Sequence, residues 1–286
     1  MNLSQWSELF IRWAHVFAGI MWVGATFYFT WLDGRFTELE EKAKTDPNAE
    51  KTVWMVHSGG FYLVEKQRRP QMMPLMLHWF KWESFTTWIT GFFLLGIVYY
   101  QGGLLVEFED WPISKGAAIG LSIGFLLAGW VVYDLLWKFV KNELVGICIS
   151  FLLIAFCAFL FLGGANIDIG GMHLSWHPWH ALFPARAAYL QIGAMMGTIM
   201  AANVWMRILP PQRRMVAALK AGQEPNLEEG ARAKSRSKHN TFIVFPVVFT
   251  MISNHYPGTY GSPHSWLILL AMVLLGWTAA KIIRRA

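Results

Sequence analysis

The stretch LVGICISFLLIAFCAFLFLG, residues 144–163, carries no charged side chain from end to end. An α-helix needs about 20 such residues to cross a hydrocarbon core about 30 Å thick, so the stretch predicts a transmembrane helix. Comparable apolar stretches lie at residues 9–32, 74–100, 113–137, 184–208, 241–253 and 265–283. Because 55% of the residues are hydrophobic, we predict a single membrane domain over residues 1–286. Its predicted fold is an all-α integral membrane protein, a seven-transmembrane-helix bundle.

The loops between these stretches alternate in charge and indicate an orientation. The loops at 33–73 and 209–240 are rich in Lys and Arg. The loops that contain neither residue lie at 101–112, 164–183 and 254–264. Basic loops stay in the cytoplasm, which predicts an N-terminus outside and a C-terminus in the cytoplasm. The net charge of +6 then reflects contact with anionic lipid and not with nucleic acid. Within the first loop, residues 53–64 are apolar but too short to span, which predicts an interfacial or re-entrant segment.

Four histidines lie where the predicted helices meet the two membrane faces. His15 lies about two turns into the first span from outside, and His255 ends the sixth span on that face, whereas His78 and His239 lie on the cytoplasmic side. A membrane haem b is typically held between helices by two axial imidazoles beside small residues. His15 lies in an apolar run, where an ionisable group is expensive, and Gly19 follows one turn later. We therefore predict haem b, with His15 and His255 as candidate iron ligands towards the outer face and His78 and His239 as candidate iron ligands towards the inner.

Other roles for the histidines stay open. A histidine near a helix end is often only an interfacial polar group with a water or carbonyl partner. His239 and His255 would lie about 24 Å apart along an ideal helix, which argues against two stacked haems on that helix. His173, His177 and His180 have a spacing that would suit zinc or copper on a helix face, but glycines and a proline predict a loop there.

Small and polar residues inside the predicted spans indicate close helix packing. Small residues recur every four positions on the third and fifth spans: Gly116, Gly120, Gly124 and Ala128, then Gly193, Gly197 and Ala201. Such stripes let helix backbones approach closely. Asp134, Gln191 and Asn203 are polar groups inside spans, and each is predicted to hydrogen-bond to a neighbouring helix.

Four longer stretches carry a resemblance to a known family. They are WAHVFAGIMWVGATFYF (13–29), VHSGGFYLVEK (56–66), FPARAAYLQIGAMMGTIMAANVWMRILPPQRRM (183–215) and RSKHNTFIVFPVVFTMISNHYP (236–257). Together they resemble the N-terminal membrane domain of the bacterial membrane-bound urate oxidase (urate hydroxylase) family, over nearly the whole chain. The resemblance implies a multi-pass protein of the bacterial inner membrane that oxidises urate towards 5-hydroxyisourate.

The same resemblance implies a route for the electrons. Full-length members of the family are thought to end in a c-type cytochrome, whereas this sequence ends after the seventh span. We therefore expect electrons to pass through haem to a separate cytochrome c or a quinone. No catalytic residue is assigned, and Arg186 is a candidate for urate binding on its charge alone. Two other interpretations stay open: a non-catalytic membrane subunit of a larger respiratory or photosynthetic complex, and a transporter for a small molecule or a metal ion.

Overall fold

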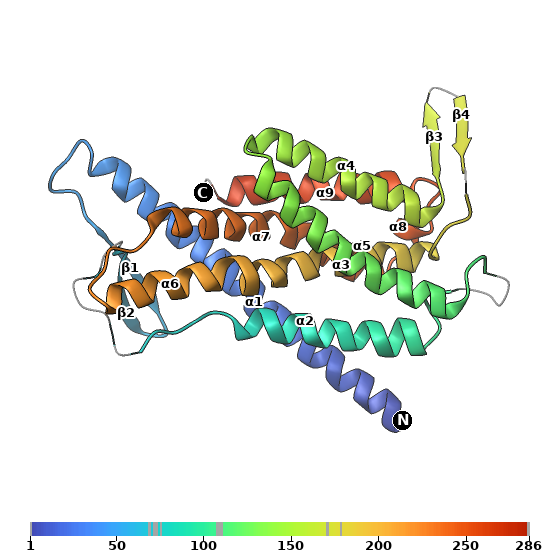
Figure 1. Cartoon of the computed structure of the whole chain (residues 1–286), viewed down its shortest axis with the longest axis horizontal. Coiled ribbons are helices and arrows are strands. Elements are labelled where there is room, and N and C mark those ends of the chain that lie inside the picture. The colour runs from blue at the N-terminus through green and yellow to red at the C-terminus, as the bar shows by residue number, and fades with distance from the viewer. Residues whose placement is uncertain are drawn as a thin grey trace.

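The computed structural model describes residues 2–67, 70, 74, 76–106, 111–169, 172–177 and 179–284, and most of them are helical (Figure 1). The helices are α1 (Leu3–Lys42), α2 (Trp82–Leu94), α3 (Lys115–Phe139), α4 (Glu143–Leu162), α5 (Ala185–Ala202), α6 (Leu209–Lys220), α7 (Leu227–Ser253), α8 (Pro257–Tyr260) and α9 (Ser265–Ile283). The π-helical turn η1 (Leu95–Gln101) continues α2, and η2 (Asn203–Ile208) joins α5 to α6. Two antiparallel hairpins pair β1 (Thr52–His57) with β2 (Gly60–Glu65) and β3 (Ala165–Ile169) with β4 (Met172–Trp176).

Several helices have the length and composition of membrane spans. In the part of the chain that the structure describes, five helical segments are long and apolar enough to cross a membrane: Leu3–Lys42, Lys115–Phe139, Glu143–Leu162, Ala185–Lys220 and Ser265–Ile283. The prediction is confirmed as a mostly helical structure with five helical segments that could span a membrane, fewer than the seven predicted. α2 and α7 are not among the five, since α2 carries Glu83 and several threonines and only the C-terminal half of α7 is apolar.

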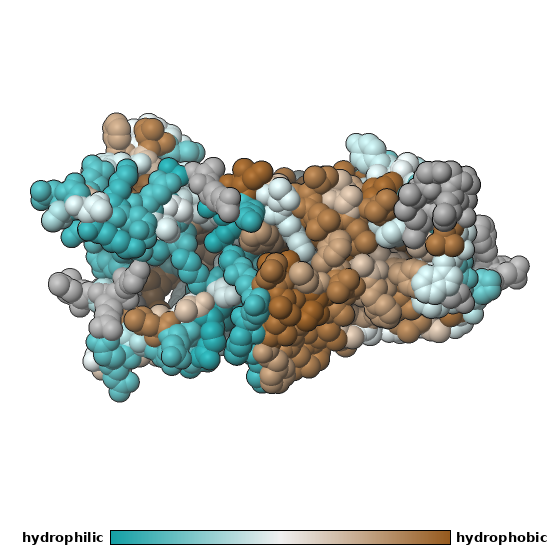
Figure 2. Space-filling view, turned by 90° about the horizontal axis from the view of Figure 1, so that it is seen from above, coloured by the Kyte–Doolittle hydropathy of each residue, from teal (hydrophilic) through white to brown (hydrophobic). Residues whose placement is uncertain are grey.

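Along the long axis of the molecule, a charged end is followed by an apolar body. In Figure 1, β1, β2 and α6 lie at one end, whereas β3, β4 and α8 lie at the other. Figure 2 shows that the end with β1, β2 and α6 is mainly hydrophilic and that a broad hydrophobic surface follows it. The described parts of the basic segments 33–73 and 209–240 therefore gather at the hydrophilic end.

Large apolar side chains cover the outside of the body. Phe10, Trp13, Leu127, Leu152 and Phe156, on α1, α3 and α4, are each more than half exposed. A continuous surface of this kind is unfavourable in water and is what lipid requires. The outer faces of these helices therefore suit the hydrocarbon core of a bilayer.

Two hairpins depart from the all-α prediction. Residues 53–64, predicted as an interfacial or re-entrant segment, make up most of β1 and β2, which are joined by a turn at Ser58 and Gly59 with φ of 50° and 76°. Successive side chains of a strand point to opposite faces, so this run presents two faces. Val53 packs one of them against Leu32 and Phe36 of α1. The hairpin was missed because a run that is apolar on both faces shows no alternation.

Gln191 fastens α5 to α3 inside the bundle. The Ser122 hydroxyl donates to Gln191 Oε1 at 2.7 Å, and Gln191 Nε2 donates to the Ser122 carbonyl oxygen at 2.8 Å. Both residues are at most 1% exposed. The prediction that Gln191 hydrogen-bonds between helices is confirmed, and the reciprocal pair satisfies a buried amide that would otherwise cost about 1–3 kcal/mol.

The predicted helix contact is confirmed at Gly193 of α5, whereas it is wrong at Gly197 and at the three glycines of the α3 stripe. A Cβ on Gly193 would lie 2.9 Å from the Cβ of Thr250 on α7, and closer still to its hydroxyl. A Cβ on Gly116, Gly120 or Gly124 would meet no described atom within 4 Å. Thus α5 and α7 touch at Gly193, whereas the glycine face of α3 points out of the bundle.

We expect Gly193→Ala and Gly197→Ala, on the same helix, to change stability in opposite directions. A methyl group at 193 forces α5 away from Thr250, and overpacking of this kind costs about 1–3 kcal/mol. A Cβ at 197 meets no described atom within 4 Å, so alanine there gains up to about 1 kcal/mol of helix propensity. Thermal unfolding in detergent measures both variants, and equal shifts would contradict the contact at Gly193.

Candidate functional site

His15 lies partly buried between α1 and α2. Its Nδ1 atom is 2.9 Å from the carbonyl oxygen of Thr87 and 3.1 Å from the hydroxyl of Thr90. A carbonyl oxygen only accepts, so Nδ1 of the neutral imidazole carries the proton and donates it. Nε2 then keeps its lone pair, and no described residue hydrogen-bonds to it. Histidines that ligate a metal through one nitrogen commonly have the other held by a carbonyl or carboxylate in this way.

The absence of a side chain at Gly91 leaves room for the His15 ring to pack against α2. A Cβ on Gly91 would lie 2.9 Å from Cε1 of the His15 ring. Thr87 and Gly91 are one helical turn apart, so the carbonyl group and the open surface face α1 together. Sequence reasoning missed both residues, because a Thr–Gly pair gains this meaning only when the partner helix is known.

His239 lies on α7 against α3, two residues before the predicted sixth span. Its Nδ1 atom is 2.7 Å from the Tyr133 hydroxyl, and its ring centre is 4.1 Å from that of Trp137. Burial, followed by the charges of Arg236 and Lys238, lowers the pKa of His239 to about 4. The imidazole is therefore neutral at pH 7.

A chain of buried amides decides which nitrogen of His239 carries the proton. The Met200 carbonyl oxygen accepts from Asn240 Nδ2 at 3.0 Å, which leaves Asn240 Oδ1 to accept from Asn203 Nδ2 at 2.9 Å. Asn203 Nδ2 also donates to the Tyr133 oxygen at 3.0 Å, and His239 Nδ1 is the acceptor, among the described residues, to which the buried Tyr133 hydroxyl can donate its own proton. Nε2 of His239 therefore holds the proton, unlike a histidine that ligates iron through Nε2. The prediction that Asn203 hydrogen-bonds between helices is confirmed.

The other two predicted ligands are exposed. His78 lies in the non-helical segment before α2, with its ring centre 4.5 Å from that of Phe80. His255 follows the end of α7 and donates its backbone N–H to the Ile252 carbonyl oxygen at 3.0 Å. Within the described residues, no hydrogen bond or ring contact joins any two of the four predicted ligands. Which histidines pair as axial ligands therefore stays a prediction.

Asp134, predicted to hydrogen-bond between helices, holds two arginines. Its carboxylate accepts from Arg207 Nε at 2.7 Å, with a second contact through Arg207 Nη2, and from Arg236 Nη2 at 3.0 Å. Asp134 is 7% and Arg236 9% exposed, whereas the Arg207 side chain is 46% exposed. One carboxylate against two guanidinium groups leaves a net charge of +1. We call this group the inner polar cluster: Tyr133, Asp134, Asn203, Arg207, Arg236, His239 and Asn240.

Asn166 holds together the loops around β3 and β4. Its Oδ1 accepts from His177 Nε2 at 3.0 Å, and its carbonyl oxygen accepts from His264 Nδ1 at 3.2 Å. A hollow of about 220 Å³ borders Asn166 and His177. Of the other histidines considered for zinc or copper, His180 is exposed and the side chain of His173 lies outside the described residues. The described residues contain no group of three His, Cys, Asp or Glu side chains that could hold a metal ion.

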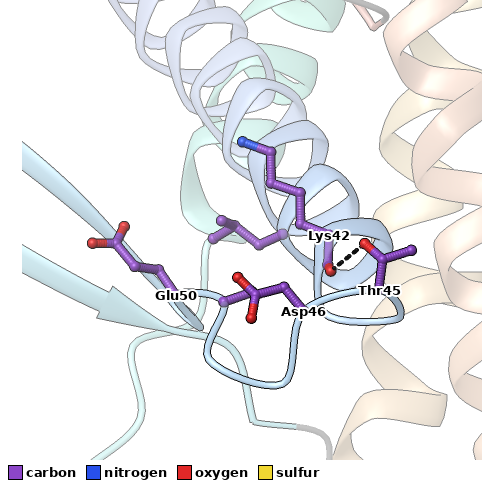
Figure 3. A pocket seen from close by; sticks show the side chains of 6 residues that line it. Lys42, Thr45, Asp46 and Glu50 are labelled. Carbon is purple, nitrogen blue, oxygen red and sulfur yellow. Dashed lines mark hydrogen bonds between the residues drawn. The ribbon is translucent and has the colours of Figure 1, made fainter.

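A larger hollow, of about 350 Å³, lies where α1 ends. Figure 3 shows Lys42, Thr45, Asp46 and Glu50 around it, with the Thr45 hydroxyl donating to the Lys42 carbonyl oxygen at 3.0 Å. These four residues belong to one helix end and the loop that follows it, and all four are exposed. The hollow is a surface recess and borders none of the four predicted haem ligands.

The fold is that of a helical protein with segments that could span a membrane. In it, His15 of α1 and His239 of α7 each hydrogen-bond to a residue of a neighbouring helix. The sequence profile described as urate oxidase N-terminal matches residues 1–285. The chain therefore belongs to the urate oxidase N-terminal family, as its sequence resemblance predicted. No curated protein and no solved structure shows a match to it.

Proposed function

We propose that this chain is the haem-binding membrane domain of an oxidoreductase that acts on urate. The family match over residues 1–285 supports the substrate. The observation that carries the cofactor is the hydrogen bond from His15 Nδ1 to the Thr87 carbonyl oxygen, which leaves Nε2 as a ligand atom between two helices. His15 thus meets the chemical requirement for holding the iron of a haem b.

The proposed topology has seven spans, with the N-terminus outside and the C-terminus in the cytoplasm of a bacterial inner membrane. The five long apolar segments supply five spans, and α2 with η1 and the C-terminal half of α7 supply the other two. The collection of the basic loops at the hydrophilic end in Figure 2 supports this orientation. His15 and His255 then belong to the outer half, and His78 and His239 to the cytoplasmic side.

The proposed reaction takes two electrons from urate and adds water. Urate and water give 5-hydroxyisourate, two protons and two electrons, and a separate c-type cytochrome or a quinone accepts the electrons. Haem b, when bound, supplies the redox centre between them. The chain's own part is to hold the imidazole of His15 in one tautomer through Thr87, and to exclude water from the α1–α2 contact.

The first test is a reduced-minus-oxidised absorbance spectrum of the detergent-purified protein, recorded under anaerobic conditions. We expect dithionite to produce the α-band of a b-type haem, and urate as the only reductant to produce the same band. A haem band that urate fails to produce would contradict the substrate. A well-folded preparation without any haem band would contradict the oxidoreductase.

A non-catalytic membrane subunit is the second candidate, and the glycine face of α3 favours it. A Cβ on Gly116, Gly120 or Gly124 would meet no described atom within 4 Å, and small residues at this spacing promote close helix association. Haem-free protein that copurifies with other membrane polypeptides is the result that would favour this candidate.

A further inference from the structure

Two buried polar atoms of the inner polar cluster have no hydrogen-bond partner. They are Oδ1 of Asn203 and Nη1 of Arg236, on residues that are 0% and 9% exposed. An unpaired buried donor or acceptor costs about 1–3 kcal/mol, and native proteins keep few of them. The cluster therefore lacks a donor for Asn203 Oδ1 and an acceptor for Arg236 Nη1, and one partner with both groups would satisfy the two atoms.

Both atoms belong to side chains fixed around Tyr133. Asn203 Nδ2 donates to the Tyr133 hydroxyl at 3.0 Å, and the Arg236 guanidinium lies 5.0 Å from the centre of its ring. Asn240, which accepts from Asn203, follows Arg236 by one turn of α7. The unpaired groups are therefore held in place by η2, α3 and α7 together.

The surrounding hydrogen bonds decide what the partner must offer. Both protons of Asn203 Nδ2 are used, so its free Oδ1 requires a donor. Arg236 uses Nη2 on Asp134, so its free Nη1 requires an acceptor. The cluster has a net charge of +1, and the neighbouring Lys238 is neutralised by Glu143 at 2.5 Å. A partner that fits offers a donor, such as an N–H group, and an acceptor oxygen, and the positive charge of the cluster favours an anion.

The cluster reaches the surface of the molecule at one edge, through Arg207. Asn203 and Arg207 both belong to the π-helical turn η2, and such turns are frequent at functional sites. Arg207, with 46% of its side chain exposed, is the edge of the cluster towards the surface. In Figures 1 and 2, α6 and the first half of α7 form part of the hydrophilic end, and η2 is the turn at which the apolar helix α5 continues into α6.

We propose that Asn203 and Arg236 form a binding site for a planar cyclic amide anion that carries a ring N–H beside a carbonyl oxygen. The ring N–H donates to Asn203 Oδ1, and the oxygen accepts from Arg236 Nη1. Urate, an anion at neutral pH, has this pattern of groups. The choice of urate as the ligand rests on the proposed function, whereas the site itself rests on the two unpaired atoms and the charge of the cluster.

Equilibrium binding of radiolabelled urate tests the site, with the full chain in detergent, oxidised, anaerobic and without an electron acceptor. Arg236→Lys keeps a cation beside Asp134 but removes Nη1, and we expect it to weaken urate binding by about tenfold or more. Arg232→Lys, one turn earlier on α7 and exposed, is the matched control and should bind urate as the wild type does. Equal affinity in the two variants would overturn the site.

A ligand series on the wild-type chain gives a second test that does not depend on a folded variant. Tetramethylurate has neither an N–H group nor a negative charge, so we expect it to bind at least about tenfold more weakly than urate. Equal binding of the two ligands would overturn the proposal and leave buried water as the partner of Asn203 and Arg236.

The outcomes separate this site from the proposed reaction. Urate that binds in an Arg236-dependent way but does not reduce haem would leave the site standing and contradict urate oxidation. Urate that reduces haem, with an affinity unchanged in Arg236→Lys, would leave the reaction standing and overturn the site.

Discussion

His15→Ala is expected to remove the b-type α-band from the purified protein, with haem content falling by more than about tenfold. The reason is geometric: Nδ1 of His15 is fixed 2.9 Å from the Thr87 carbonyl oxygen, so Nε2 is the atom left to ligate iron. Alanine removes that atom and leaves the helix contact otherwise intact. Haem per mole of protein, together with the reduced-minus-oxidised spectrum, measures the loss.

Two further variants make this result specific. His57→Ala is the matched control, because His57 is exposed at the end of β1 and its ring forms a hydrogen bond with the neighbouring Ser58 hydroxyl, at 2.9 Å. It should keep its haem. Gly91→Ala keeps the imidazole but places a Cβ 2.9 Å from His15 Cε1, so the ring is displaced and part of the haem is lost. Full haem content in His15→Ala would contradict the ligand assignment, whether or not the protein oxidises urate.

The apolar stretches were predictable because hydropathy depends on composition alone. α9 spans Ser265–Ile283, the same residues as the seventh predicted stretch, and α4 begins one residue before the predicted 144. The ends of α1 were not predictable in this way. The helix continues to Lys42, ten residues past the apolar stretch, since its charged residues are good helix formers that need no lipid. Hydropathy shows which residues suit lipid, whereas the backbone decides where a helix stops.

The partners of the polar residues were not predictable, because they lie far away in sequence. Thr87 is 72 positions from His15, and Arg236 is 102 positions from Asp134. His15 could be recognised without knowing its partner, because an ionisable group in an apolar run is itself a signal. Arg236 gave no such signal, since an arginine among other cations resembles a solvated loop residue until a buried carboxylate faces it.

Asp134→Ala is expected to be the most destabilising single substitution in the inner polar cluster. Its carboxylate pairs with Arg236, whose side chain is only 11% exposed, and with Arg207, whose side chain is 46% exposed. Arg207 can turn to water when the carboxylate is removed, but Arg236 is left as an uncompensated buried charge. Breaking a buried pair in this way costs about 3–5 kcal/mol. The free energy of unfolding in detergent, from denaturant or thermal melts, measures the loss.

An exposed ion pair on the same helix provides the control. Lys238 of α7 pairs with Glu143, but their side chains are 34% and 59% exposed, so Glu143→Ala should cost less than about 1 kcal/mol. The double variant Asp134→Ala/Arg236→Met should regain most of the stability that Asp134→Ala loses, because no buried charge then remains unpaired. A double variant as unstable as the single one would show that Asp134 acts through some other contact than its ion pair with Arg236.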